Sequence, residues 1–141
     1  MKRLDGFDSM ADALVYIQEN VYGCASRKEA EKYFRAKLPR ESYYQKKIMD
    51  FLKKQYPNAF VWKAAAGAYS QQGIPDVCAV IDGRYYGFEV KRPYIGVPSE
   101  IQKRTVELIR KAGGCAGFVT FPADVQKMIE GGVSDAGKQI R

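Results

Sequence analysis

The sequence predicts an α/β protein in which a mixed central β-sheet is flanked by helices and preceded by a helical extension. Two observations carry this prediction. Asp82-Gly83 stands between two β-prone runs, which is the strongest short-range signal for an antiparallel hairpin. A helix-length segment then separates the second run from another apolar run at 115–121, and a connection of that length suits a right-handed crossover between parallel strands. The 141 residues suffice for a substantial core.

Residues 1–40 are predicted to form the N-terminal helical extension. Apolar residues recur at helical spacing in 8–20, Gly23 interrupts them, and Ser26 with Glu29 forms a capping box that opens a second helix. Two interpretations stay open. In the one we prefer, the helices pad the core. In the other they form an arm for dimerisation or DNA positioning, with a basic face of Arg27, Lys28, Lys32, Arg35 and Lys37.

A third helix is predicted from Glu41 to about Lys54, with an inner stripe of Tyr44, Ile48, Phe51 and Leu52. Glu41 begins this stripe, where a purely structural pattern would place an apolar residue. Either it favours the positive end of the helix dipole or it belongs to a site. A strand is expected at 59–64 with Trp62 inward, followed by a small and polar loop at 65–72. Lys63 and Tyr69 are the side chains there that we expect to contact substrate.

The hairpin around Asp82-Gly83 predicts a specific register. A two-residue type I′ turn places Ile81 opposite Arg84, and counting outward places Asp76 opposite Glu89. Because side chains alternate along a strand, Asp76, Glu89 and Lys91 then share a polar face. The opposite face is almost purely apolar and is the predicted core side.

Two opposed carboxylates need a compensating charge. At a separation of about 5 Å and an effective dielectric near 20, they repel by roughly 3 kcal/mol. Lys91 supplies one positive charge, and a divalent cation such as Mg²⁺, which prefers one or two carboxylates plus water and phosphate oxygens, would supply the rest. The plainer alternative is a solvated strand face in which the carboxylates pair with Lys91.

The chain after Lys91 is expected to form a helix from Ser99 to about Ala112, with Ile101, Thr105, Leu108 and Ile109 facing the core. Ser99 and Gln102 satisfy a capping box. Gly113-Gly114 ends this helix, a strand follows at 115–121, and a last helix spans 122–130. A Gly-rich tail, 131–141, is expected to fray.

Composition narrows the chemistry. The net charge of +7 favours an anionic partner, nucleic acid first, and the absence of histidine excludes His-based catalysis and His metal ligands. Three cysteines without Cys-x-x-Cys spacing argue against a zinc site and for a reducing compartment. No apolar run approaches the length of a membrane span, and no signal-peptide core opens the chain. We therefore expect a cytoplasmic protein with no membrane partner.

Three short motifs carry a family resemblance. Gly73-Ile-Pro75-Asp76, Glu89-Val-Lys91 and Ser99-Glu-Ile-Gln102 resemble the PD-(D/E)XK nuclease superfamily, and within it the VRR-NUC (virus-type replication-repair nuclease) group. The match runs from Glu41 to about Ile129, and it implies a restriction-endonuclease-like nuclease core at 41–130. The order and spacing of the motifs are more specific than any one of them.

The resemblance implies a set of site residues. Asp76, Glu89 and the Val90 carbonyl would hold Mg²⁺ or Mn²⁺, with Glu41 completing the site. Lys91 would act on the attacking water, and Gln102 would reach back to the catalytic centre. The residues expected to contact DNA are Lys63, Tyr69, Arg92, Lys103 and Arg104.

The function expected from this resemblance is metal-dependent endonucleolytic hydrolysis of DNA. Branched or junction DNA would be the substrate, in replication, repair or recombination of a virus or mobile element, and the protein would act as a homodimer. The alternative is a DNA-binding module that kept the fold and lost catalysis. A third interpretation is a structural or interaction protein.

Overall fold

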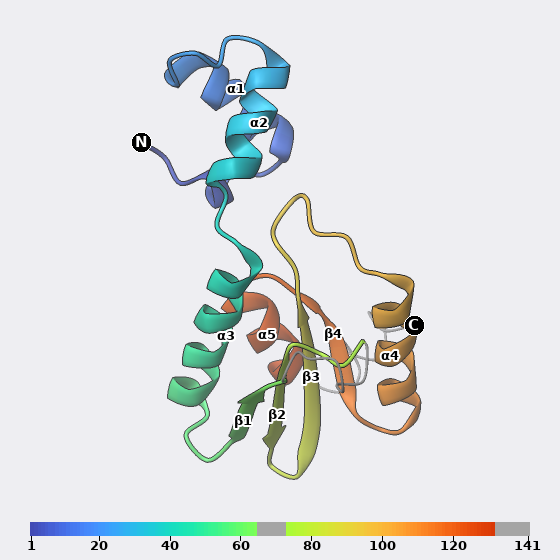
Figure 1. Ribbon diagram of the computed structural model, residues 1–141. Coiled ribbons are helices and arrows are strands. Elements are labelled where there is room, and N and C mark those ends of the chain that lie inside the picture. The colour runs from blue at the N-terminus through green and yellow to red at the C-terminus, as the bar shows by residue number, and fades with distance from the viewer. Residues whose placement is uncertain (65–72, 132–141) are drawn as a thin grey trace. The chain divides into compact units, whose positions relative to one another are not determined.

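A computed structural model describes residues 1–64 and 73–131 (Figure 1). These residues divide into two compact units. Met1–Arg40 and Pro93–Ile95 make up the N-terminal unit, and Glu41–Arg92 together with the chain from Gly96 onward makes up the sheet unit. Tyr69 and the predicted tail beyond residue 131 lie outside the described residues.

The N-terminal unit is a small helical body with its own core. A short 3₁₀ helix, Leu4–Gly6, precedes helices α1 (Met10–Asn20) and α2 (Arg27–Lys37). Ser9 caps α1, and the predicted capping box between Ser26 and Glu29 opens α2. The core consists of Ala13, Leu14, Ile17, Cys24, Ala30, Phe34 and Leu38, with Tyr94 and Ile95 packed against it. These side chains form a cluster distinct from the main core of the sheet unit, and the two interpretations of the helices, padding or an arm, stay predictions.

The sheet unit contains the mixed sheet that the sequence predicts. Its strands are β1 (Phe60–Lys63), β2 (Val77–Ile81), β3 (Arg84–Val90) and β4 (Cys115–Val119), in the order β1-β2-β3-β4. The pairs β1–β2 and β2–β3 are antiparallel, and β3–β4 is parallel. The crossover between β3 and β4 contains helix α4 (Glu100–Lys111), as predicted.

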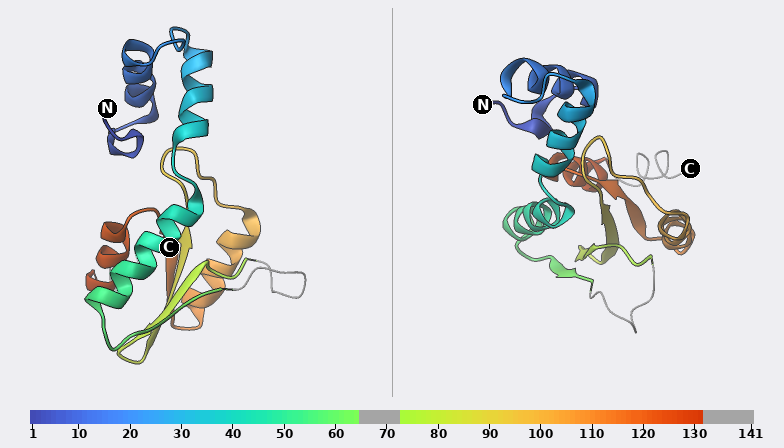
Figure 2. Two further views of the ribbon diagram at one scale, coloured as in Figure 1. Left: turned by 60° about the vertical axis from the view of Figure 1, so that its left-hand side comes forward. Right: turned by 45° about the horizontal axis from the view of Figure 1, so that its top comes forward.

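Helices cover both faces of the sheet. Helices α3 (Glu41–Gln55) and α5 (Pro122–Glu130) pack on one face, and α4 packs over β3 and β4 on the other, as Figure 2 shows. The main core lies under α3 and α5. It includes Tyr44, Ile48 and Leu52 of α3, Val77, Ala79, Ile81, Tyr86, Phe88 and Val90 of the hairpin, and Val125 and Met128 of α5. This confirms the apolar face predicted for the hairpin.

The predicted inward-facing positions of Ile101 and Leu108 in α4 and of Trp62 in β1 are wrong, whereas those of Thr105 and Ile109 are confirmed. In α4 the side that faces the sheet holds Val106, which is buried, with the half-buried Gln102, Thr105, Ile109 and Arg110, whereas Ile101 and Leu108 are exposed. Arg110 connects this side of α4 to the sheet, because its Nε donates a hydrogen bond to the Ala116 carbonyl at 3.0 Å. In β1, Val61 packs against the main core, and Trp62 lies on the opposite face beside Tyr85.

None of the helices in residues 1–64 and 73–131 combines the length and the apolar character needed to cross a membrane.

Candidate active site

The β2–β3 turn sets the geometry of the site. Asp82 and Gly83 have φ values of 50° and 79°, as both central residues of a type I′ turn require. Ile81 pairs with Arg84 and Val77 with Phe88, which is the predicted register. One step further along this register brings Asp76, at the entrance to β2, beside Glu89.

Asp76 is held in place through both its backbone and its side chain. Its carbonyl accepts a hydrogen bond from the Ala64 N–H at 2.9 Å, which extends the pairing of β1 with β2. Its Oδ2 accepts a hydrogen bond from the Val90 N–H, also at 2.9 Å. The close approach depends on Gly87, since a Cβ there would lie 2.8 Å from Pro75 Cγ. The carboxylate is thereby fixed over the end of β3.

The Glu89 side chain is buried beside Asp76. It is 1% exposed, and its Oε2 has no hydrogen-bond partner among the described residues. Burial raises the pKa of Glu89 to about 9; the adjacent Asp76 carboxylate contributes to the increase, while Lys91 opposes it. Glu89 lies on the face of β3 that the sequence predicts to be polar, yet its side chain is buried. The alternative of a solvated strand face is therefore wrong at Glu89.

Glu41 and Lys91 interact electrostatically with the carboxylate pair. Glu41 is the first residue of α3, and partial burial raises its pKa, while Lys91 lowers it and Asp76 raises it. The Lys91 N–H donates to the Val119 carbonyl at 2.8 Å, which ties the end of β3 to β4. Among the described residues the Lys91 ammonium makes no ion pair within 4.0 Å with Asp76 or Glu89. A simple salt bridge therefore does not account for these carboxylates.

The donor set fits a hard cation of the Mg²⁺ class. Two adjacent carboxylates, one of them with a buried oxygen that lacks a partner, offer what such an ion takes from protein, and water and phosphate oxygens can complete its shell. Within residues 1–64 and 73–131 no group of three or more acidic, Cys or His side chains converges on one point. Glu41 does not converge with the pair in this arrangement, and its predicted role in completing the site stays a prediction.

The positions of the other predicted site residues do not by themselves indicate a role in the site. Gln102 Oε1 accepts a hydrogen bond from the Ser99 N–H at 2.9 Å, so its carbonyl oxygen serves the capping box. Lys63 pairs with Val77 and is exposed on the edge strand. Lys103 and Arg104 are exposed on α4, and Lys103 pairs with Glu100 at 3.2 Å. Roles for these residues in catalysis or DNA binding stay predictions.

Sequence reasoning missed two features of the site. It did not identify the Val90 N–H as the donor that orients Asp76, and it did not expect Glu89 to be enclosed. The signal for the first was present, since Gly87 interrupts a strand of large side chains two residues before Glu89. No local signal indicates the second, because burial depends on how segments distant in the sequence pack together.

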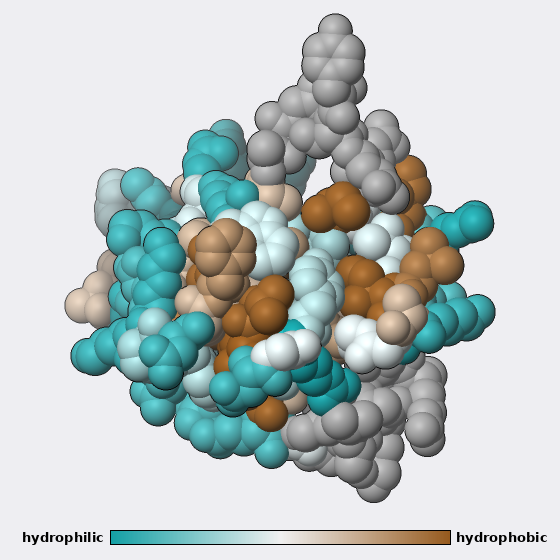
Figure 3. All heavy atoms as spheres, turned by 90° about the horizontal axis from the view of Figure 1, so that it is seen from below, coloured by the Kyte–Doolittle hydropathy of each residue, from teal (hydrophilic) through white to brown (hydrophobic). Residues whose placement is uncertain are grey.

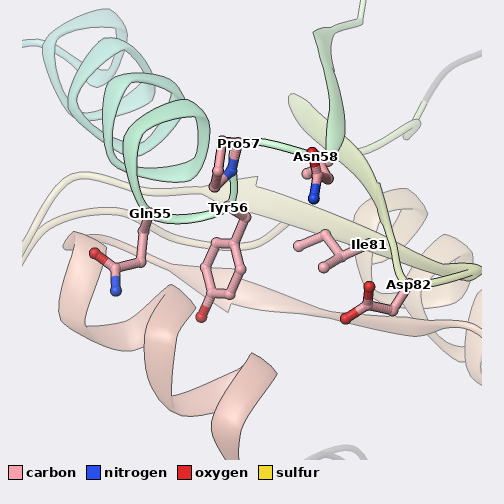
Figure 4. Close-up of a pocket in the computed structure, with 7 residues that line it drawn as sticks. Gln55, Tyr56, Pro57, Asn58, Ile81 and Asp82 are labelled. Carbon is pink, nitrogen blue, oxygen red and sulfur yellow. The ribbon is translucent and has the colours of Figure 1, made fainter.

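A separate shallow pocket of about 170 Å³ lies at the opposite end of the sheet. The end of α3 and the β2–β3 turn line it, through Gln55, Tyr56, Pro57, Asn58, Ile81 and Asp82 (Figure 4). Figure 3 shows apolar and hydrophilic side chains interspersed over the underside of the molecule. Only Asp82 brings a carboxylate to this pocket, so it does not match the predicted chemistry.

The comparisons with known proteins bear on the fold. No protein-family model matches the sequence, and no curated protein matches it. A solved structure described as a "VRR_NUC domain protein" matches with a TM-score of 0.52 and 19% identity, over 67% of this chain and 88% of that one. The chain has a VRR_NUC fold. A second solved structure, a "VRR_NUC domain", matches with a TM-score of 0.49 and 28% identity, over 64% and 94% of the two chains. In this VRR_NUC fold the carboxylate pair lies where the hairpin register predicts it.

Proposed function

We propose that this chain is a DNA endonuclease of the VRR-NUC group that hydrolyses phosphodiester bonds with Mg²⁺ or Mn²⁺. One observation carries the proposal: a buried glutamate oxygen without a partner lies beside a second carboxylate and close to a lysine, at the end of a strand in a VRR_NUC fold. The net charge of +7 supports an anionic substrate.

Asp76, Glu89 and the Val90 carbonyl would hold the cation. When bound, a divalent cation offsets charge on the scissile phosphate and makes water more acidic. Holding it also relieves the cost of the unpartnered Glu89 oxygen. Because Glu41 does not converge with Asp76 and Glu89 among the described residues, we place it beyond the ligands, where it would accept a hydrogen bond from water near the pair.

Lys91 provides the positive charge that the protein itself contributes. Its positive charge lowers the pKa of both Glu89 and Glu41. In the proposed reaction it would orient the attacking water and offset the negative charge that grows on the phosphate oxygens as the bond to the leaving oxygen breaks. Gln102 would add a polar contact through its amide nitrogen.

The substrate and assembly extend this proposal. We assign branched or junction DNA of a virus or mobile element as the substrate and a homodimer as the active form, because one chain carries one site and opposed strands need two. Arg92, Lys103 and Arg104 would contact DNA phosphates. The three cysteines, Cys24, Cys78 and Cys115, are free and buried, which fits a reducing cytoplasmic compartment.

A panel of end-labelled DNA substrates tests the activity. Junction, flap, nicked, duplex and single-stranded DNA are incubated with the protein and Mg²⁺, Mn²⁺ or EDTA. We expect cleavage with either cation, strongest on a branched substrate, and none with EDTA. Salt-sensitive DNA binding without cleavage under any of these conditions would instead identify the chain as a DNA-binding module.

A further inference from the structure

One face of the sheet carries aromatic residues on β1 and β3. Phe60 and Trp62 of β1 pair with Val80 and Cys78 of β2, and Val80 pairs with Tyr85 of β3. Directly opposed residues of an antiparallel ladder point to the same side, so these five residues share one face.

The three rings form a continuous row. The Phe60 and Trp62 centroids are 5.3 Å apart with their planes at 42°, and the Trp62 and Tyr85 centroids are 6.3 Å apart at 53°. The Tyr85 hydroxyl donates to Cys78 Sγ at 3.3 Å, which fixes one end of the row. The other end is open, since Phe60 is 68% exposed.

This aromatic row (Phe60, Trp62 and Tyr85) lies on the same face as the carboxylates. Asp76 stands two residues before Cys78 in the chain, and Glu89 stands four residues after Tyr85, so strand alternation places all of them on one side. Helix α4 covers this side over β3 and β4, and Val80 of β2 is 37% exposed. The row therefore shares a face with the candidate active site, and its nearest member in the register, Trp62, pairs with Cys78, two residues from Asp76.

We propose that the aromatic row binds unpaired bases of a single-stranded DNA segment adjacent to the bond that is cut. This rests on the proposed nuclease function and specifies its substrate. Aromatic side chains stack on bases regardless of sequence, but only where the bases are unpaired, because a duplex hides the faces of its bases. The positive net charge attracts the phosphates of DNA. It therefore favours a DNA strand over a neutral apolar partner.

Trp62 makes the contact directly observable, because it is the only tryptophan of the chain. The intact protein in EDTA, which prevents cleavage, is titrated with an oligothymidylate and with the fully paired duplex of the same length. We expect the single strand to quench Trp62 emission and the duplex to leave it nearly unchanged. Far-UV circular dichroism verifies that each variant below is folded.

Two substitutions at Phe60 separate stacking from general apolar contact. Phe60 is largely exposed at the start of an edge strand, so its truncation opens no cavity. Both Phe60→Ala and Phe60→Leu should weaken single-strand binding by about tenfold, since neither retains an aromatic face. Tyr22→Ala, which removes an exposed aromatic ring in the N-terminal unit, is the matched control and should bind like the parent.

Each contrary result has a distinct meaning. Unchanged Trp62 emission at saturation with the single strand, or parental affinity of Phe60→Leu, overturns the proposal. Emission that changes on protein dilution without DNA assigns the row to contact between two copies and also overturns it. If the single strand quenches Trp62 and Phe60→Ala binds weakly but no DNA is cut with Mg²⁺, the base-binding row stands and the nuclease function fails.

Discussion

Glu89 is the residue whose environment departs most from that of an ordinary surface carboxylate. It is 1% exposed and adjacent to Asp76, and both burial and that neighbour raise its pKa. Without a cation the protonated form is therefore favoured, and the ionised form costs free energy. A cation that binds the folded site must displace this proton, so cation affinity should increase with pH.

The same shift predicts how stability depends on pH. An acid with a folded pKa above its unfolded value of about 4.5 stabilises the fold below that value, and the contribution is lost as pH rises toward the folded pKa. In EDTA, Glu89→Gln removes this loss, because its amide can donate to Asp76 at any pH. We expect Glu89→Gln to be more stable than the parent above neutral pH by about 1–3 kcal/mol. Asp76→Asn should behave similarly, as its amide oxygen can still accept from Val90.

Thermal melting across a Mg²⁺ or Mn²⁺ titration measures this effect. The parent should melt at increasing temperature with cation concentration, whereas Glu89→Gln and Asp76→Asn should not respond. Asp50→Asn, an exposed acid of α3 that pairs with Lys46, is the control and should respond like the parent. If Asp76→Asn melts lower in EDTA and still responds to Mg²⁺, Asp76 and Glu89 do not form the site described.

A substitution at Lys91 should remove catalysis and leave the stability of the fold unchanged. It is half-buried at the end of β3, and its backbone N–H, which any non-proline substitution retains, makes the hydrogen bond to Val119. Lys91→Ala should therefore fold, bind DNA and bind the cation while losing cleavage by at least about 100-fold. Cleavage rates with excess enzyme, alongside binding isotherms, provide the measurement. Cleavage at the parental rate by a folded Lys91→Ala protein would contradict the proposed mechanism.

At the scale of the element, the β2–β3 hairpin positions the carboxylates of the site. Its type I′ turn fixes the register, and Gly87 lets the Pro75-Asp76 segment lie against β3. The backbone of Val90 then receives the Asp76 carboxylate. The site thus depends on a close contact between two chain segments rather than on side chains alone.

Gly87→Ala tests this close contact. The new methyl would lie 2.8 Å from Pro75 Cγ and 3.0 Å from the Tyr85 hydroxyl oxygen, so Pro75 or the strand must shift. We expect a loss of about 1–3 kcal/mol in unfolding free energy, and weaker cation binding because Asp76 moves with Pro75. Denaturant unfolding and the cation titration measure the two effects. Gly6→Ala, where an added methyl meets no atom within 4 Å, is the control.

At the scale of the whole molecule, the chain passes between its two units next to site residues. Glu41 follows the first part of the N-terminal unit directly, and Lys91-Arg92 immediately precede the Pro93–Ile95 segment that returns to it. Tyr94 anchors this segment within the N-terminal unit. Its hydroxyl donates to the Phe7 carbonyl and accepts from the Phe7 N–H, and its ring packs against Phe34.

Tyr94→Phe should loosen this anchor without removing the ring. Loss of the hydroxyl leaves two backbone groups of Phe7 without that partner, which we expect to cost about 1–3 kcal/mol in the N-terminal unit. Hydrogen exchange should show faster exchange of the Phe7 amide, with little change in the strands of the sheet. Tyr22→Phe, at a fully exposed tyrosine, serves as the control. Parental exchange at Phe7 in Tyr94→Phe would show that the hydroxyl does not anchor the segment.

Assembly is the second property of the whole molecule that can be tested. A homodimer would bring two sites to one branched substrate, so we expect sedimentation to show two copies at working concentration, alone or with a junction. Both opposed strands of the junction should then be cut within one encounter. A single copy under both conditions would rule out the proposed dimer while leaving the single-site chemistry intact.

The sequence by itself determined the features that depend on local rules. Asp82-Gly83 determined the turn and thereby the pairing of Val77 with Phe88, and Ser26 and Ser99 determined where two helices begin. These features follow from backbone sterics and hydrogen bonds within a few residues. The carboxylate pair at Asp76 and Glu89 was predictable for the same reason, since it lies one step beyond a register that the turn sets.

Only the tertiary structure decided which surfaces are enclosed. No local pattern specifies that Glu89 is 1% exposed, because burial depends on segments that lie far away in the chain, such as β4, whose Phe118 pairs with Glu89. The orientation of α4, with Ile101 exposed and Arg110 turned toward Ala116, likewise depends on its contact with the sheet. Burial results from contacts among segments distant in sequence, and it is burial that raises the pKa of Glu89 and leaves its oxygen without a partner.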